Sequence, residues 1–268
     1  MNFDELKAKY EKLGIPTPTK EMIKTSEQIE GIRQAGIINT KVLDYVAQNI
    51  KAGMTTNDID KLVSSKTKEL GGICAPLNYE GFPKSVCTSI NDQVCHGIPD
   101  EKTVLKNGDI INVDCTTIYN GYYADASRMF LIGDVDPKAK RLVEVSKECL
   151  DLAVKNLKPF SRLRDIGHNI EKHAKANGFS VVHEIGGHGV GIDFHEDPFI
   201  YHYGVKNTGI VLFPGMVFTI EPMINEGSRS VFLDASNNWT IYTDDGGWSS
   251  QFEYTVLITE TGVEILSY

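Results

Sequence analysis

Residues 108–114 read GDIINVD, and residues 215–221 read GMVFTIE, so that a glycine and a β-prone apolar run twice lead to a carboxylate. The same offset joins two earlier segments, KAGMTTNDIDKLVSSKTKELGG from Lys51 and KPFSRLRDIGHNIEKHAKANGF from Lys158. Each of these segments has the pattern of a helix ended by glycine. One offset kept over so long a span indicates an internal duplication.

The duplication predicts an α+β fold in which two helix-and-strand halves share one central sheet. We divide the chain into an N-terminal extension (1–22) and a single domain (23–268), with halves of about 23–135 and 136–268. The extension is expected to be a short helix followed by the proline-punctuated connector GIPTPTK. After it, a Thr/Ser cap begins an amphipathic helix. Its apolar positions are Ile29, Ile32, Ile37, Val42, Leu43 and Val46.

Composition narrows the class of protein. The 268 residues carry a formal net charge of -9, which argues against a general nucleic-acid binder, because phosphate neutralisation requires clustered Lys and Arg. Five cysteines without a C-x-x-C pair make a disulfide scaffold or a thiolate zinc site improbable. No apolar run approaches a membrane span, and the N-terminus lacks the apolar region of a signal peptide. We therefore expect a soluble, cytoplasmic protein.

The dipeptide Asn120-Gly121 between two β-rich runs predicts a two-residue type I′ hairpin. With that turn, Asp114 pairs with Ser127, and Asp125 lies two residues from that partner on the same face. Such diagonal neighbours are roughly 7 Å apart, so both carboxylates can reach a common centre.

The second half offers a matching pair of carboxylates. Glu221 is equivalent to Asp114, and EYTVLITETG from Glu253 resembles DASRMFLIG from Asp125, with an insertion in the second half. Buried unpaired charges are expensive, so four acids in apolar or β-prone runs require cations. Two divalent ions would balance about four negative charges. Such a ligand set suits Mn, Fe or Co, and Zn less distinctively.

An imidazole is expected to complete the site, and the segment HEIGGHGVGIDFHEDP offers His188 and His195. His188 lies among glycines, whose backbone can approach a ligand closely. The sequence HEDPF is not a zinc-binding H-E-x-x-H helix, because position 199 is Phe and Pro198 would break the helix. The pattern alone leaves the choice between the two histidines open.

The motifs GGHGVG…FHEDP, TIEPM, VDCT…YADASRMF and SINDQVCHGIP, in this order, resemble those of type I methionine aminopeptidases with the pita-bread fold. The resemblance covers about Ile23 to Tyr268, and the absence of a helical insertion between His195 and Glu221 favours type I over type II. It implies pseudo-twofold halves around a central antiparallel sheet covered by helices. It also implies a metal-bridging hydroxide that hydrolyses the bond after an N-terminal methionine.

The resemblance implies five ligands for two divalent ions (Co, Mn, Fe, Zn or Ni). Asp125 and Glu253 would bridge the ions, Asp114 would bind one ion, and His188 with Glu221 would bind the other. Three residues would act on the substrate. His96 would contact it near the scissile amide, His195 would donate a hydrogen bond to the scissile carbonyl, and Glu221 would also move a proton to the leaving amine.

An apolar slot for the methionine side chain follows from the same resemblance. Its expected lining is Tyr79, Phe82, Cys87, Phe194 and Trp239. Glu80 is a departure, since some bacterial members have a histidine there, and it changes the charge at the pocket mouth. The loop of residues 225–250 is a second unusual feature. His168, His173, His183 and His202 are interpreted as surface or structural residues, and a Cys95–His96 protease pair is disfavoured because adjacent residues of an extended chain point apart.

Two alternatives stay open. A proline-directed aminopeptidase or prolidase of the same fold would share the five ligands, although the short N-terminal extension disfavours it. A non-catalytic relative that binds protein or RNA would be expected to lose ligands, and this chain keeps them. The expected substrates are nascent polypeptides that begin with Met and a small residue. The ribosome is a further expected partner, for which the sequence contains no motif. Neither a membrane nor a nucleic acid is expected to bind, and the protein is expected to be a monomer.

Overall fold

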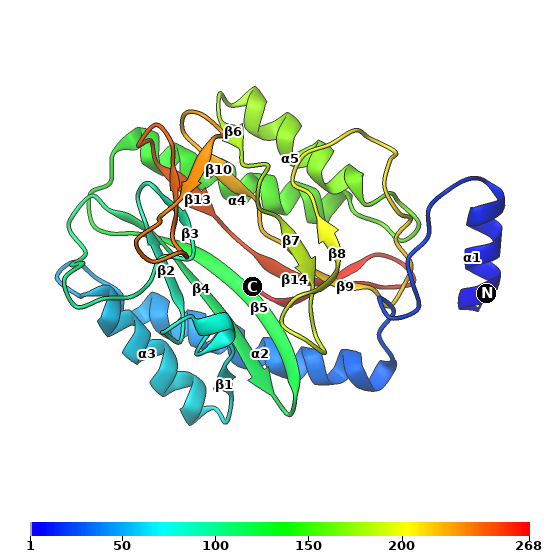
Figure 1. Cartoon of the computed structure of the whole chain (residues 1–268), viewed down its shortest axis with the longest axis horizontal. Coiled ribbons are helices and arrows are strands. Elements are labelled where there is room, and N and C mark those ends of the chain that lie inside the picture. The colour runs from blue at the N-terminus through cyan, green and yellow to red at the C-terminus, as the bar shows by residue number, and fades with distance from the viewer. Residues whose placement is uncertain (1) are drawn as a thin grey trace.

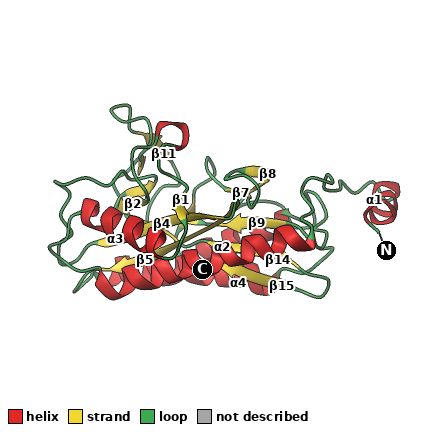
Figure 2. Ribbon diagram, turned by 90° about the horizontal axis from the view of Figure 1, so that it is seen from below, coloured by secondary structure: helices red, strands yellow, loops and turns green. Residues whose placement is uncertain are grey.

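Helices and strands form two layers in the computed structural model, which describes residues 2–268. Figure 2 shows α2, α3 and α4 against one face of the strands β4, β5, β9 and β14, with loops on the opposite face. The helices are α1 (Phe3–Lys12), α2 (Ser26–Asn49), α3 (Thr56–Glu69), α4 (Pro137–Asn156) and α5 (Arg164–Ala176), with a 3₁₀ turn at Tyr79–Gly81. Within the described residues, none of these helices is long and apolar enough to cross a bilayer.

The strands form four small sheets, two of which make up the centre of the molecule (Figure 1). The first-half sheet has the order β1-β4-β2 with β5 on β4, and the second-half sheet has the order β15-β14-β9-β7-β8. The strands are β1 (Ile73–Cys74), β2 (Cys87–Ile90), β3 (Gln93–Cys95), β4 (Ile110–Tyr119), β5 (Tyr122–Leu131), β6 (Ser180–Val181), β7 (Gly187–Gly189), β8 (Glu196–Ile200), β9 (Val217–Ile220), β10 (Met223–Asn225), β11 (Val231–Leu233), β12 (Ile241–Thr243), β13 (Ser249–Gln251), β14 (Tyr254–Ile258) and β15 (Val263–Ser267).

The predicted hairpin is confirmed as β4 and β5. Asn120 and Gly121 have φ of 50° and 82°, as a type I′ turn requires. In the resulting register Asp114 pairs with Ser127, and Asp125 pairs with Thr116. The two aspartates therefore lie on one face of the hairpin, as the sequence predicted.

The duplication is visible in the helices as well as in the strands. The predicted repeat helices are α3 and α5, and the glycines that follow them, Gly71 and Gly178, have φ of 81° and 80°. Both helices are therefore ended by a residue in the left-handed region, where glycine carries no steric penalty. α2 and α4 are the other matching pair, each in sequence before its repeat helix.

The two halves meet along β5 and the segment before β14. The Glu253 backbone N–H donates to the Ser127 carbonyl at 3.0 Å, and the Asn112 side chain donates to the Gln251 carbonyl at 2.8 Å. These hydrogen bonds connect the two central sheets to each other. The expected pita-bread architecture, a central antiparallel sheet with helices over it, is confirmed.

Each half has its own apolar core beneath its strands. One core packs α2 and α3 against β4, and the other packs α4 and α5 against β9 and β14. Within α2 the expected positions Ile32, Val42, Leu43 and Val46 are buried. The expectation for Ile37 is wrong, because Ile37 is 42% exposed and Ile38 faces the core instead. Helical periodicity places Ile38 on the same face as Val42, four residues later, whereas Ile37 points away.

The N-terminal helix α1 lies at one end of the molecule (Figure 1) and packs on the second-half core. Phe3 meets Phe213 edge-on at 6.0 Å, and Tyr10 stacks on Phe160 at 6.2 Å. The short helix expected within residues 1–22 is thus present, while the division into an extension and a single domain stays a prediction.

Asn39 supports one specific stability prediction. Its buried side chain donates to the Cys115 carbonyl at 2.7 Å and accepts from the Thr117 hydroxyl at 2.8 Å, which fastens α2 to β4. We expect Asn39→Leu to lower the free energy of unfolding by about 2–4 kcal/mol, because both partners would remain buried and unpaired. Urea denaturation followed by circular dichroism measures the change. The exposed Gln48→Ala on the same helix is the control, expected within about 0.5 kcal/mol of the parent.

Candidate metal centre

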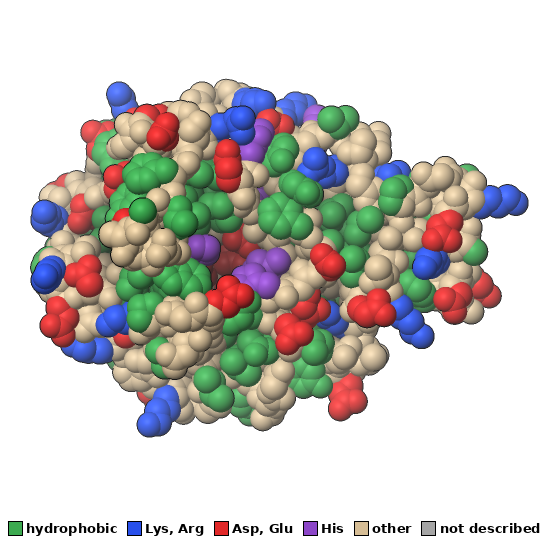
Figure 3. All heavy atoms as spheres, in the orientation of Figure 1, with side chains coloured by type: hydrophobic (Ala, Val, Ile, Leu, Met, Phe, Trp, Pro, Cys, Tyr) green, Lys and Arg blue, Asp and Glu red, His purple; other side chains and the backbone are tan. Residues whose placement is uncertain are grey.

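A cleft of about 750 Å³ opens where the two halves meet. It lies on the face that the helices leave uncovered, and Figure 3 shows histidine and acidic side chains at its centre with apolar side chains around them. Every residue that the sequence proposed for the site lines this cleft. They are Tyr79, Phe82, Cys87, His96, Asp114, Asp125, His188, Phe194, His195, Glu221, Trp239 and Glu253.

The hairpin supplies Asp114 and Asp125. Asp125 is 4% exposed, and its Oδ1 accepts a hydrogen bond from the Thr116 hydroxyl at 2.8 Å. Its backbone is tied across to the other half, because the Thr255 hydroxyl donates to the Asp125 carbonyl at 2.7 Å. Asp114 is only partly covered and faces the same cleft.

Glu221 directly follows β9 and is held from several sides. Its Oε1 accepts from the Thr219 hydroxyl at 2.7 Å, and its Oε2 accepts from the Gln251 amide at 3.1 Å. Its backbone N–H donates to Nε2 of the buried His202 at 3.1 Å. The orientation of this carboxylate is therefore fixed at both oxygens and at the main chain.

Glu253 is the least satisfied member of the group. It directly precedes β14 and is 1% exposed, and its Oε1 has no hydrogen-bond partner among the described residues. A buried carboxylate oxygen without a donor is costly, so it indicates a ligand that the protein itself does not supply.

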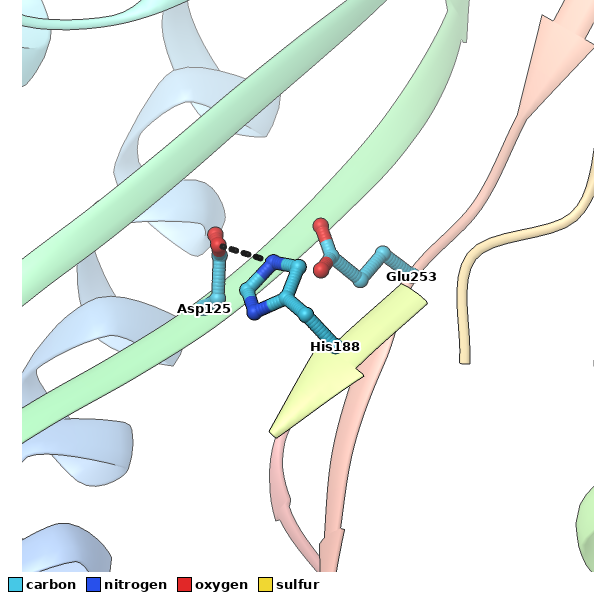
Figure 4. Close-up of side chains that lie close together, drawn as sticks. All are labelled: Asp125, His188 and Glu253. Carbon is cyan, nitrogen blue, oxygen red and sulfur yellow. Dashed lines mark ion pairs between the residues drawn. The ribbon is translucent and has the colours of Figure 1, made fainter. Parts of the chain in front are cut away.

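His188, on β7, supplies a nitrogen to this group. Its Nδ1 donates to the Gly189 carbonyl at 2.9 Å, which leaves Nε2 free as a lone-pair donor. Nε2 lies 3.6 Å from Glu221 Oε1 and 3.9 Å from Asp125 Oδ2. Ligand atoms of Asp125, His188 and Glu253 all lie within 4.8 Å of one another, and Figure 4 shows the three side chains converging.

Burial determines the protonation of the cluster. Desolvation raises the pKa of Asp114 to about 7 and that of Glu221 to about 8. Desolvation, followed by repulsion from neighbouring carboxylates, raises the pKa of Asp125 and Glu253 well above the usual range. Burial lowers the pKa of His188 to about 3, so its imidazole is neutral. In the absence of cations, the four carboxyl groups therefore do not all ionise at the same time near neutral pH.

These residues fit divalent cations. No Lys or Arg of the described residues forms an ion pair with the four carboxyl groups. Together with the orphaned oxygen of Glu253 and the neutral imidazole nitrogen of His188, they form a donor set of oxygen and nitrogen. Such donors bind Mn, Fe, Co, Ni or Zn, and the residue types alone do not select among them. Asp125, His188 and Glu253 form the tightest candidate group, with Asp114 and Glu221 beside it.

His195 lies beside this group but outside it. Its ring is 4.2 Å from that of His188 between centroids, and its Nδ1 is 2.9 Å from the Tyr79 hydroxyl. Desolvation lowers the pKa of His195, which favours the neutral ring. The structure therefore separates the two histidines of the GGHGVG…FHEDP segment into a member of the acidic cluster and a neighbour that faces the cleft.

His96 reaches the cleft through an unusual backbone. Its φ is 55°, so the rule that adjacent side chains of an extended chain point apart does not apply at Cys95 and His96. Burial raises the pKa of the Cys95 thiol well above its usual range and lowers that of His96 to about 4. A neutral buried thiol beside a neutral imidazole still argues against a thiolate nucleophile.

Aromatic side chains form the rest of the wall. Phe82 meets Trp239 edge-on at 5.2 Å, and Phe194 packs on Tyr79 at 4.8 Å. Trp239 comes from the 225–250 insertion, whose strand β12 pairs with β3 and so brings the insertion over the cleft. Glu80 also lines the cleft and is exposed.

The polar groups that support the acids were not predicted from the sequence. Thr219 and Glu221, like Gln251 and Glu253, are two residues apart, and period-two spacing at the strand ends could have suggested both pairs. His202 gave no local signal, because its contact with Glu221 joins separate segments. Its interpretation as a structural residue agrees with its complete burial.

Comparisons with known proteins identify the family of the chain. Residues 30–260 match the model described as Metallopeptidase family M24. The chain is 51% identical over 241 residues to methionine aminopeptidase A of Synechocystis, covering 90% of this chain and 94% of that protein. Its structure is similar to methionine aminopeptidase from Rickettsia prowazekii, with TM-score 0.90, 43% identity and coverage of 92% and 99%. Prolidase from Pyrococcus furiosus is less similar, with TM-score 0.72, 26% identity and coverage of 92% and 65%.

The raised carboxyl pKa values predict that metal affinity rises with pH. Asp114 and Glu221 stabilise the metal-free fold when protonated, and this stabilisation is lost as pH rises from about 4 through their folded pKa values of about 7 and 8. Metal binding requires the ionised forms and so releases protons. We expect the apparent affinity for Mn to increase at least about tenfold per pH unit between about pH 6 and pH 8.

Titration calorimetry in buffers of different ionisation enthalpy measures both the affinity and the released protons. Asp114→Asn is the matched variant, and it should release fewer protons than the parent. An affinity that does not change over this pH range would contradict the prediction.

Proposed function

The chain belongs to metallopeptidase family M24, as a methionine aminopeptidase, and we propose that its cleft removes the N-terminal methionine of polypeptides with the residues described above. The observation that carries the proposal is the buried cluster of acids around a neutral His188, open to an aromatic-walled cleft. The proposed substrates are newly made chains that begin with Met followed by a small residue. The ribosome, where such chains emerge, is a proposed partner.

Two divalent ions are proposed to bind at the cluster. Asp125 and Glu253 would bridge them, Asp114 would hold one ion, and His188 with Glu221 would hold the other. The orphaned oxygen of Glu253 and the free Nε2 of His188 support this assignment. When bound, such ions act as Lewis acids that polarise a carbonyl and lower the pKa of a coordinated water.

His195 is proposed to stabilise negative charge on the scissile carbonyl oxygen. When the Tyr79 hydroxyl donates to Nδ1, the ring proton stays on Nε2, which can then donate into the cleft. The lowered pKa keeps the ring neutral, so the tautomer rather than the charge determines its role. Tyr79 thus orients the donor and also forms part of the apolar wall.

Glu221 is proposed to carry a proton from the attacking water to the leaving amine. Its carboxylate is held by Thr219 and Gln251, so it can accept and return a proton without reorienting. His96, across the cleft beside Trp239, is proposed to contact the substrate near the scissile amide. Burial keeps His96 neutral and available as a hydrogen-bond donor.

The slot for the methionine side chain is proposed to consist of Tyr79, Phe82, Cys87, Phe194 and Trp239. An aromatic wall suits a flexible, polarisable thioether, which makes favourable contacts with ring edges. The buried Cys87, opposite Asp114 in the strand register, brings this slot next to the metal cluster. Glu80 at the rim adds a negative charge close to His195.

The two alternatives are less well supported. A prolidase-like activity would share the fold, but the chain is 51% identical to an aminopeptidase for methionine and only 26% identical to the Pyrococcus prolidase. A non-catalytic role would not require the proposed ligands to converge in a single cleft as they do here.

The function predicts a specific pattern of peptide cleavage. We expect the metal-loaded protein to release methionine from Met-Ala-Ser and to cleave an Xaa-Pro peptide at least roughly a hundredfold more slowly, since the slot favours the thioether. Chelation should abolish the activity, and Mn or Co should restore it. Mass spectrometry of the products measures both rates. Faster Xaa-Pro cleavage, or activity that survives chelation, would contradict the proposal, and Asp125→Asn is the inactive control.

Tyr79→Phe tests the orientation of His195 separately. Loss of the hydroxyl removes the partner of Nδ1, so we expect kcat to fall by roughly tenfold while the apolar slot stays filled and KM changes little. Steady-state kinetics on Met-Ala-Ser give both constants. Tyr123→Phe, whose ring stacks on Phe194 at 6.2 Å, is the control and should keep kcat within about twofold. Equal effects of the two substitutions would show that the Tyr79 hydroxyl has no special part.

A further inference from the structure

We propose that a buried ion pair between Lys24 and Glu196 holds the loop that carries His195, so that both are positioning residues for the reaction. This inference rests on the proposed role of His195 as the donor to the scissile carbonyl. The loop, residues 190–195, joins β7 to β8 and contains Phe194 of the proposed slot as well. Neither Lys24 nor Glu196 belongs to the metal cluster.

Glu196 makes contacts that close this loop into a turn. Its Oε1 accepts from the backbone N–H groups of Ile192 and Asp193 at 2.7 and 3.1 Å. Its other oxygen, Oε2, accepts from the Lys24 ammonium. Glu196 is the residue after His195, so the position of its carboxylate constrains the direction in which the His195 side chain leaves the loop.

Lys24 is unusually buried for a lysine. The residue is 5% exposed and its side chain only 2%, in a segment that precedes α2 and lies far from the loop in sequence. Its backbone N–H donates to the Gly215 carbonyl at 2.9 Å, and Ile23 bridges to Met216. The residues it contacts lead directly into β9, and Glu221 directly follows that strand. The ion pair thus ties the His195 loop to the strand that positions Glu221.

The base of the loop is fixed by close packing instead. Gly191 has a φ of 139°, and a Cβ there would lie 2.3 Å from Ile32 Cδ1, so any other residue would strain the backbone and displace the Ile32 side chain. The Gly191 carbonyl accepts from the Tyr123 N–H at 2.9 Å. These contacts locate the start of the loop, whereas the end that carries His195 is held by Glu196 and Lys24.

Stability alone does not account for such a pair. Desolvation of two charges offsets most of their attraction, and apolar residues of similar volume stabilise a fold as well or better. An ion pair does, however, specify one arrangement, because each charge left without its partner is expensive. We therefore assign the pair to the geometry of the cleft.

The test compares kinetics, metal binding and folding in Lys24→Met and in the surface control Lys61→Met, whose partner Asp58 is also exposed. We expect Lys24→Met to lower kcat on Met-Ala-Ser by at least about tenfold while the Kd for Mn stays within about twofold, since a small misplacement of a catalytic group is costly. The control should keep both constants. Retained kcat in a folded Lys24→Met protein would overturn the proposal.

A double-substitution cycle separates positioning from general damage. If the pair acts through His195, adding Lys24→Met to His195→Ala should lower kcat by less than about twofold beyond the single substitution. A full additional loss in that background would overturn the proposal. Lys24→Arg, which keeps a donor to Glu196, should recover part of the activity lost in Lys24→Met.

Glu196→Gln carries the test if Lys24→Met does not fold. It keeps an oxygen for Ile192 and Asp193 but loses the charge that faces Lys24, and the same non-additivity with His195→Ala is expected. Wild-type protein and Asp125→Asn are assayed alongside. Wild-type protein that does not cleave Met-Ala-Ser overturns the proposed function and the role of the pair with it. A cleaving wild type with an unaffected, folded Lys24 or Glu196 variant overturns the role of the pair alone.

Discussion

The desolvation and mutual repulsion of four clustered carboxyl groups are the constraint on which the centre of this structure depends. Desolvation and neighbouring negative charge raise the pKa of Asp125 and Glu253 well above the usual range. The protein supplies hydroxyl and amide donors to the acids, but among the described residues no ammonium or guanidinium group pairs with them. Divalent cations bound there would supply the missing positive charge, which would link the stability of the cleft to its chemistry.

The duplicated fold explains how the acids come together. Each half contributes one carboxylate from each of two antiparallel strand segments, and the halves meet where the Glu253 N–H binds the Ser127 carbonyl. The pseudo-twofold symmetry thus places the four carboxylates at similar positions where the two halves meet. The second half then adds the asymmetric parts, His188 on β7 and the insertion that brings Trp239 over the cleft. The four acids therefore come from the duplicated part of the fold, whereas His188 and Trp239 come from parts that only the second half has.

Neutral and charged supports have separate tasks around the site. Thr116, Thr219 and Gln251 donate neutral hydrogen bonds to the acids and so orient them without adding a charge that would compete with a metal ion. The charged support, Lys24 with Glu196, lies at the loop that carries His195. The positive charge of Lys24 is acceptable there because it is paired with Glu196 and does not contact the acidic cluster.

The sequence by itself determined the fold and the metal-binding candidates, since both depend on local periodicity. The Asn120-Gly121 turn fixed the strand register that puts Asp114 and Asp125 on one face, and a constant offset brought in Glu221 as the equivalent of Asp114. The resemblance, and not the spacing, separated His188 from His195. Ile37 was misassigned although Ile38, four residues before Val42, fits the helical period better, and the structure buries Ile38.

Only the tertiary structure decided which polar groups support the site. His202 reaches the Glu221 backbone, Gln251 reaches its carboxylate, and Lys24 reaches Glu196 across most of the length of the chain. These contacts join segments that are separate in the sequence, so the local spacing of residues does not predict them. They form because a buried polar group requires a hydrogen-bond partner. For these groups the partner is distant in sequence and comes within reach only when the two halves have packed together.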